Sequence, residues 1–269
     1  MNLNQATIAY QPIVSVCGPL HRVCAHEALF RLPGVAEGGI EGLIAGIEAS
    51  GEAGALDAQV LNLVLARQAL DARASGRHRH LSINVSPQSI CSLDYLRLVE
   101  RALLTHPHPE SIQFEVTERQ ALCAPAIAET FSELLAAFGA SIAIDDFAAT
   151  PAQVQMIERL SGVGRIKIDR GVVRAAIDSV ADYNLIREAI ELAAECGASV
   201  VAEGVEDPEQ LYFLRTAFPE ITHAQGYLFG RPAESFSDDV DMRARLRELL
   251  PARHRERLAV TASVAGLRA

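Results

Sequence analysis

The chain has 269 residues, of which 49% are hydrophobic, and it carries a formal net charge of -10. This size and apolar fraction suffice for one large core and are close to the roughly 250 residues of a (β/α)₈ barrel. The acidic balance disfavours binding to a nucleic-acid polymer, so an anionic ligand would need a local metal ion or arginine.

Short β-rich runs alternate with longer helical patterns, which is typical of βα units around a parallel sheet. We expect strands at 8–16, 22–30, 81–85, 112–116, 141–145, 165–168, 199–202 and 223–228. We expect helices at 39–50, 55–74, 87–105, 122–139, 151–161, 182–196 and 207–217, with a last one near 236–250. The turn Cys-Gly-Pro-Leu (17–20) lies between the first two strands, so the pattern predicts a β-hairpin. The βα pattern ends near residue 250, and we assign 1–250 to the barrel and 251–269 to a helical or disordered tail.

The cysteines and the N-terminal sequence indicate in which cellular compartment the protein is expected. Five cysteines form an odd set without C-x-x-C spacing, which indicates neither a disulfide framework nor a zinc knuckle. The N-terminus lacks a basic region followed by a long apolar run, and no window of about 18 apolar residues occurs. We therefore expect a cytoplasmic protein with no membrane segment.

Polar side chains end or follow nearly every expected strand. They are Glu27, Asn84, Glu115, Asp145, Asp146, Lys167, Glu203 and Gln225. Active sites of β/α barrels lie at the C-terminal ends of the strands, so this placement predicts a site there. Taken singly, such a residue is more often a helix cap or a solvated loop residue. The adjacent carboxylates of Asp145 and Asp146 repel each other unless a cation or hydrogen-bond donors lie between them.

Five or six carboxylates at one mouth require counter-charge. Oxygen ligands without paired cysteines or metal-spaced histidines favour Mg²⁺ or Mn²⁺ over Zn²⁺, and two such ions would activate a water and clamp a phosphoryl group. Lys167 is the only lysine among 24 basic residues, and its compact charge suits orienting that water. The histidine pairs in RHRH (77–80) and HPHP (106–109) could also bind metal, but solvated turns are the simpler interpretation.

Eight short motifs occur in a fixed order. They are YQPIV (10–14), EALFR (27–31), INVSP (83–87), FEVTE (114–118), IDDF (144–147), KID (167–169), VAEGVE (201–206) and QGYLFGRP (225–232). With them, the chain resembles the EAL family of cyclic di-GMP phosphodiesterases from near residue 8 to near residue 235. The resemblance implies a modified TIM barrel that begins with a hairpin, two Mg²⁺ or Mn²⁺ ions, and hydrolysis of cyclic di-GMP to linear pGpG.

The resemblance also implies a role for each matched residue. Glu27, Asn84, Glu115 and Asp145 would hold one metal, and Asp145, Asp146 and Glu203 would hold the second. Lys167 and Gln225 would position the attacking water, and Gln11 and Arg31 would contact the nucleotide, Arg31 through a phosphate. Glu118 would brace the active-site loop and Glu206 the guanine-binding region. A homodimer and a regulatory protein partner are left open.

One loop departs from the family pattern. Where the family continues Asp-Asp-Phe-Gly-Thr-Gly, this chain has Asp145-Asp146-Phe147-Ala148-Ala149-Thr150-Pro151. Both glycines are absent, so a positive φ in this loop would be costly, and Pro151 stiffens it. A second departure replaces the family's Leu-Pro-x-Asp with LSGVG (160–164).

Three hypotheses follow. The intact set of ligands favours a working phosphodiesterase, either slow or dependent on a partner that orders the loop. The altered loop leaves open a receptor or interaction module that binds cyclic di-GMP or another protein without turnover. An unrelated metal-dependent barrel hydrolase is the third alternative.

Overall fold

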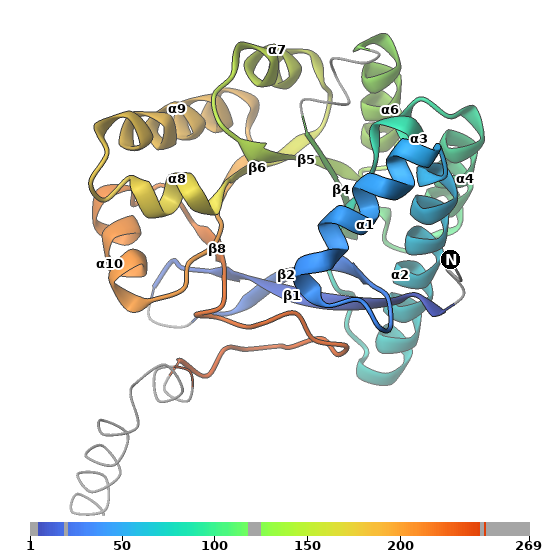
Figure 1. The fold of residues 1–269 in the computed structure, drawn as a ribbon, viewed down its shortest axis with the longest axis horizontal. Helices are drawn as coiled ribbons and strands as arrows, with labels where there is room; N and C mark the ends of the chain where they lie inside the picture. The colour runs from blue at the N-terminus through green and yellow to red at the C-terminus, as the bar shows by residue number, and fades with distance from the viewer. Residues whose placement is uncertain (1–4, 19–20, 118–124, 243–244, 246–269) are drawn as a thin grey trace, which may run out of the picture.

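Eight strands form a closed barrel in the order β1 to β8 (Figure 1). This computed structural model describes residues 5–18, 21–117, 125–242 and 245. The strands are β1 (Thr7–Ser15), β2 (Val23–Arg31), β3 (Leu81–Asn84), β4 (Ile112–Val116), β5 (Ser141–Phe147), β6 (Val163–Ile168), β7 (Ser199–Ala202) and β8 (His223–Gln225). The barrel predicted from the sequence is thereby confirmed.

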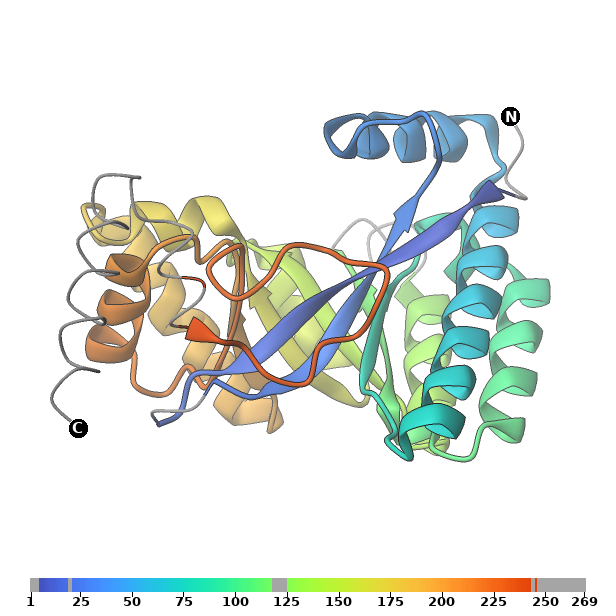
Figure 2. The same cartoon turned by 90° about the horizontal axis from the view of Figure 1, so that it is seen from below.

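Helices surround the barrel, except the first, which lies across one end of it (Figure 1 and Figure 2). They are α1 (Glu37–Ser50), α2 (Ala53–Ser75), α3 (Pro87–Ile90), α4 (Leu93–Thr105), α6 (Pro125–Ala137), α7 (Pro151–Arg159), α8 (Arg170–Ala175), α9 (Val180–Cys196) and α10 (Pro208–Ala217), with the 3₁₀ turn η2 (Pro109–Ser111) before β4. Within the part of the chain that the structure describes, no helix has both the length and the apolar character needed to cross a membrane.

The predicted hairpin is confirmed. Strand β1 runs antiparallel to both β2 and β8, whereas the neighbouring pairs from β2 to β8 are parallel. Gln11 pairs with Glu27 across the hairpin, and Ile13 pairs with Gln225 on the other side. A reversed first strand therefore brings Gln11 beside Glu27, in the middle of β2, and close to Gln225, at the end of β8.

Side-chain alternation separates an outer core from the barrel interior. Phe114 of β4 points outward and meets Phe131 of α6 edge-on, with ring centroids 5.4 Å apart. Ile13, Ala25 and Val201 form a separate small cluster of buried residues. Ala25 and Val201 lie two residues before Glu27 and Glu203, so these side chains share one face, and the apolar cluster lies beneath the polar mouth.

One predicted helix is divided in the structure, and one helix of the structure was not predicted. The expected helix 87–105 is two helices, because Ser92 accepts a hydrogen bond from the backbone N–H of Tyr95 and caps a new start at α4. The short helix α8 was not expected, and Asp169 caps it through the N–H of Gly171.

The helix expected near 236–250 is wrong for residues 236–241, which are not helical. Instead, residues 233–241 run across the outside of the hairpin (Figure 2), with bridges between Tyr10 and Ala233 and between Arg22 and Asp239. The ring of Phe236 lies 4.3 Å from that of Tyr10. Phe236 and Val240 pack against the core in this arrangement, which removes part of their apolar surface from water. The predicted tail, 251–269, lies outside the described residues.

Candidate active site

Lys167 lies at the centre of a carboxylate cluster at the mouth of the barrel. Its Nζ is 2.6 Å from Oε2 of Glu115, 2.8 Å from Oε1 of Glu203, 2.9 Å from Oδ1 of Asp145 and 3.6 Å from Oε2 of Glu27. The lysine comes from β6, and its neighbours come from β4, β5 and β2 and from the residue after β7. Because Lys167 is 1% exposed, these ion pairs are shielded from water.

Amide side chains fix the orientation of Glu27. Asn84 Nδ2 donates to Glu27 Oε1 at 2.9 Å, and Gln225 Nε2 donates to Glu27 Oε2 at 2.6 Å. Gln225 Nε2 also donates to Gln11 Oε1 at 3.1 Å, and Gln11 Nε2 donates to the carbonyl of Gly230 at 3.3 Å. The structure thus brings together the predicted residues from β1, β2, β3 and β8.

The cluster carries more negative than positive charge. Burial raises the pKa of Glu115 well above its ordinary value, and the charge of Glu27 adds to this effect. Burial also raises the pKa of Glu203 to about 8, against the opposing influence of Lys167. Burial alone would raise the pKa of Glu27, but Lys167 and the hydrogen bond from Gln225 lower it. One ammonium does not compensate four carboxylates, so an added cation would be favourable here.

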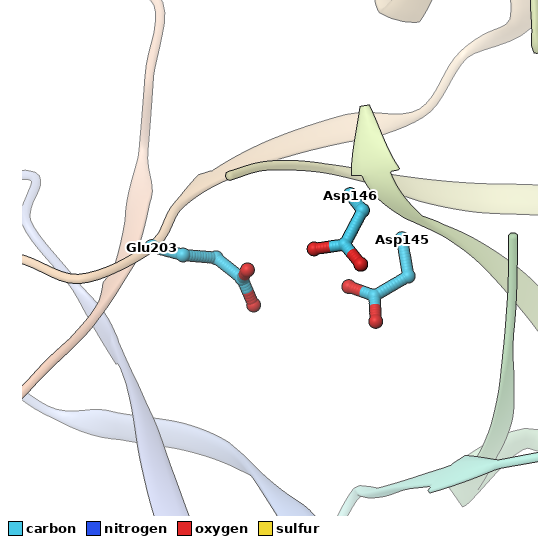
Figure 3. Close-up of side chains that lie close together, drawn as sticks. All are labelled: Asp145, Asp146 and Glu203. Carbon is cyan, nitrogen blue, oxygen red and sulfur yellow. The ribbon is translucent and has the colours of Figure 1, made fainter. Parts of the chain in front are cut away.

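The donor atoms at the mouth suit hard divalent cations. Asp145, Asp146 and Glu203 each offer a carboxylate oxygen, and these oxygens lie within 4.8 Å of one another (Figure 3). Within the described parts of the chain, Glu115 Oε1 and Gln225 Oε1 are buried without a hydrogen-bond partner. Oxygen-only donors, an excess of negative charge and an unsatisfied buried carboxylate oxygen all fit Mg²⁺ or Mn²⁺.

Three further predicted residues lie apart from the cluster or cannot be placed. Arg31 ends β2, and its Nη2 is 2.9 Å from Oε1 of Glu37 in α1. Glu206 is exposed, and its backbone N–H donates to Gln210 Oε1 at 2.7 Å. Glu118 lies outside the described residues.

Comparison with known proteins decides the family, because a family model described as the EAL domain matches residues 1–232. The chain belongs to the EAL family. Cyclic di-GMP phosphodiesterase NbdA of Pseudomonas aeruginosa is 30% identical over 239 residues, which cover 85% of this chain and 29% of that protein. The chain spans 20% to 40% of the length of the curated relatives that it matches.

Solved structures of EAL proteins share the fold. The PaMucR phosphodiesterase in complex with c-di-GMP is 27% identical with a TM-score of 0.74, covering 86% of this chain and 92% of that one. A calcium and c-di-GMP complex of Klebsiella pneumoniae BlrP1 is 26% identical with a TM-score of 0.72, covering 87% of this chain and 58% of that one. The EAL motifs seen in the sequence thus lie on the barrel that such proteins share.

The loop that departs from the EAL pattern is held by Gln153. Its Nε2 donates to the carbonyl of Asp146 at 2.9 Å, and its Oε1 accepts from the N–H of Ala148 at 2.9 Å. Thr150 and Gln153 also form a capping box at the start of α7. The loop keeps positive φ angles, +50° at Asp146 and +52° at Ala149, although neither residue is glycine. The sequence thus identified the strained loop but not the glutamine that braces it.

Asp57 is a second residue that sequence reasoning missed. It lies on α2 and is buried, and its Oδ2 accepts from the N–H of Ser86 at 2.8 Å and from Ser89 Oγ at 2.6 Å. These bonds anchor the turn that follows Asn84. An acidic residue beside Leu56, Val60 and Leu61 on a helix was the available signal, because a buried carboxylate needs hydrogen-bond partners.

Proposed function

We propose that this EAL chain is a metal-dependent phosphodiesterase that hydrolyses cyclic di-GMP to linear pGpG. The observation that carries the proposal is the set of carboxylates and amides around Lys167, contributed by separate strand ends. The carboxylates and amides offer the oxygen ligands that Mg²⁺ and Mn²⁺ prefer, and the lysine offers a compact positive charge for the attacking water. Two comparisons support cyclic di-GMP as the substrate. The relative NbdA is named a cyclic di-GMP phosphodiesterase, and the structure of the PaMucR phosphodiesterase contains c-di-GMP.

The two metals would share one ligand, Asp145. The first set is Glu27, Asn84, Glu115 and Asp145, and the second is Asp145, Asp146 and Glu203. Bound Mg²⁺ or Mn²⁺ would lower the pKa of a water and offset the charge that develops on the phosphoryl group.

Lys167 and Gln225 would orient the attacking water. The ammonium of Lys167 is fixed in place by its carboxylate neighbours, so it presents a charge that needs little reorganisation during the reaction. Gln225 Oε1 is buried and has no hydrogen-bond partner in the described parts of the chain, so it can accept a hydrogen bond from that water. Gln225 Nε2 meanwhile stays bonded to Glu27.

Arg31 and Gln11 would bind the nucleotide, Arg31 through a phosphate, whereas Glu206 would brace the guanine region and Glu118 the active-site loop. Arg31→Ala should mainly weaken nucleotide affinity, because a guanidinium pairs with phosphate in two parallel hydrogen bonds. Calorimetry would detect the loss, and unchanged binding would remove Arg31 from the site. A homodimer, a regulatory partner and a cytoplasmic location stay predictions.

The direct test incubates purified protein with cyclic di-GMP and Mn²⁺ or Mg²⁺ and resolves pGpG by chromatography. An EDTA arm tests the metal dependence. Asp145→Asn is the matched variant, because it keeps the size of the side chain and removes the charge. Formation of pGpG that neither EDTA nor this variant reduces would contradict the metal assignment.

A receptor without turnover is the alternative, and the positive φ of Ala149 in the loop that follows Asp146 favours it. Replacing 148–151 with the glycine-containing loop of the family should raise turnover more than affinity, because interactions made mainly in the transition state act on kcat. If the native chain forms no pGpG with any metal, and the graft creates none while binding stays tight, the receptor is the correct function.

A further inference from the structure

The guanidinium of Arg31 is already occupied by a carboxylate of the same chain. Its Nη2 lies 2.9 Å from Oε1 of Glu37, and its Nη1 donates to the carbonyl of Phe30 at 2.9 Å. The side chains of Arg31 and Glu37 are 23% and 52% exposed. Solvent and ligands can therefore reach the pair, which lies at the end of β2, four residues beyond Glu27.

A carboxylate and a phosphate oxygen compete for the same guanidinium donors. Resting on the proposed function, in which Arg31 contacts a phosphate of the nucleotide, we propose that Glu37 is a latch. Its carboxylate holds Arg31 in the nucleotide-free protein, and the nucleotide phosphate has to displace it. Glu37 therefore sets the affinity and couples nucleotide binding to the position of α1.

The first turn of helix α1 is held by few interactions, so it can move when the ion pair breaks. Glu37 lies in its first turn, and Ala36 at the N-cap provides no side-chain hydrogen bond. Only Ile40 and Ile47 of the helix are buried. Figure 2 shows α1 beside the end of β2, joined to it by a short connection. A helix with few buried contacts can shift without disturbing the barrel.

Glycines weaken the helix further. Gly38, Gly42 and Gly46 recur at four-residue spacing, and a Cβ at each would meet nothing within 4 Å. Packing therefore does not require glycine at these positions, whereas glycine lowers helix propensity. A lower helix propensity makes a shift of α1 less costly, so the ion pair to Arg31 can influence where its first turn lies.

Calorimetric titration of cyclic di-GMP into the calcium-loaded protein tests the latch, with calcium chosen because BlrP1 forms a complex with both. The variant Glu37→Gln keeps the shape and removes the charge. Glu41→Gln is the matched control, since Glu41 is exposed one turn further along α1 and forms no ion pair with any residue that the structure describes. Both variants remove one negative charge from the same helix.

We expect Glu37→Gln to bind about two- to fivefold more tightly than wild type at low salt, the range given by partly exposed ion pairs. The gain should shrink at high ionic strength because salt screens the pair, and Glu41→Gln should match wild type. Unchanged or weaker binding by Glu37→Gln, an equal gain in both variants, or no binding in any of the three proteins would overturn the latch. A missing pGpG product in the magnesium assay would instead overturn the proposed hydrolysis and leave the calcium titration to decide the latch.

Discussion

Replacing Lys167 with methionine removes the positive charge at the centre of the mouth and keeps a side chain of similar length. The carboxylates of Glu115, Glu203 and Asp145, between 2.6 and 2.9 Å from Nζ, would then face one another without a partner. Leaving buried charges unpaired costs about 3–5 kcal/mol, so we expect the free energy of unfolding in EDTA to fall by that amount. For a chain of this size the loss corresponds to roughly 6–20 °C in Tm.

Magnesium should reduce the difference in free energy of unfolding between Lys167→Met and wild type, because its charge compensates the same carboxylates. A cation at 100 times its Kd stabilises the folded state by about 2.7 kcal/mol, and we expect a larger gain for Lys167→Met than for wild type. Urea unfolding followed by circular dichroism, in EDTA and in saturating magnesium, measures both effects.

Two controls accompany this experiment. Arg187→Met breaks an exposed ion pair to Glu220, 2.8 Å long, and should leave the midpoint nearly unchanged. Lys167→Arg keeps the charge and should lose turnover, because a planar fork misplaces the water. A Lys167→Met protein as stable as wild type in EDTA would refute the reasoning, as would equal stabilisation of both proteins by magnesium.

Three other predictions concern separate parts of the molecule. Glu27→Ala or Asp145→Ala should lower pGpG formation more than about 100-fold with an unchanged circular dichroism spectrum, because each removes a proposed metal ligand; near wild-type turnover would contradict the assignment. Ala149→Gly should raise the free energy of unfolding by up to about 1 kcal/mol in a melting experiment, because relief of the +52° φ exceeds the added entropy of the unfolded chain; a lower Tm would show that the loop is unstrained. Burial and the charge of Arg165 lower the pKa of His223 from 6.5 to about 4. Between pH 6.5 and 4, His223 is therefore protonated in the unfolded chain and neutral in the folded one. The stability that neutral His223 provides is therefore complete above pH 6.5 and is lost as pH falls towards 4, and His223→Asn should reduce this loss by on the order of 1 kcal/mol in urea titrations at pH 7.5 and 4.5; parallel curves would exclude His223 as the cause.

The strands and the polar mouth could be predicted from the sequence because both depend on local pattern. A short apolar run that ends in a carboxylate identifies a strand and its functional end together, as SIAI followed by Asp145 and Asp146 does. The order of the strands around the barrel then brought these side chains together.

Other features depend on which segments meet in space. Glu37 carries no motif, and its pairing with Arg31 depends on where α1 lies after the turn. The bonds from Asp57 to Ser86 and Ser89 form because α2 packs against the turn after β3. Residues 236–241 have the mixed apolar and acidic character of a surface helix, but the uncovered hairpin binds them in extended form.

Closure of this barrel pairs the first strand with the last. The mouth can therefore form only after the last strand has been synthesised. The hydrogen bond from Gln225 to Gln11 spans 214 residues, and β1 pairs along β8 as well as β2. Contacts of such sequence separation slow folding, so a nascent chain holds β1 with one open edge until β8 leaves the ribosome. An open edge of this kind is a template for pairing with another chain. The arrival of residues 223–225 therefore both completes the candidate site and pairs the edge of β1 that was open until then.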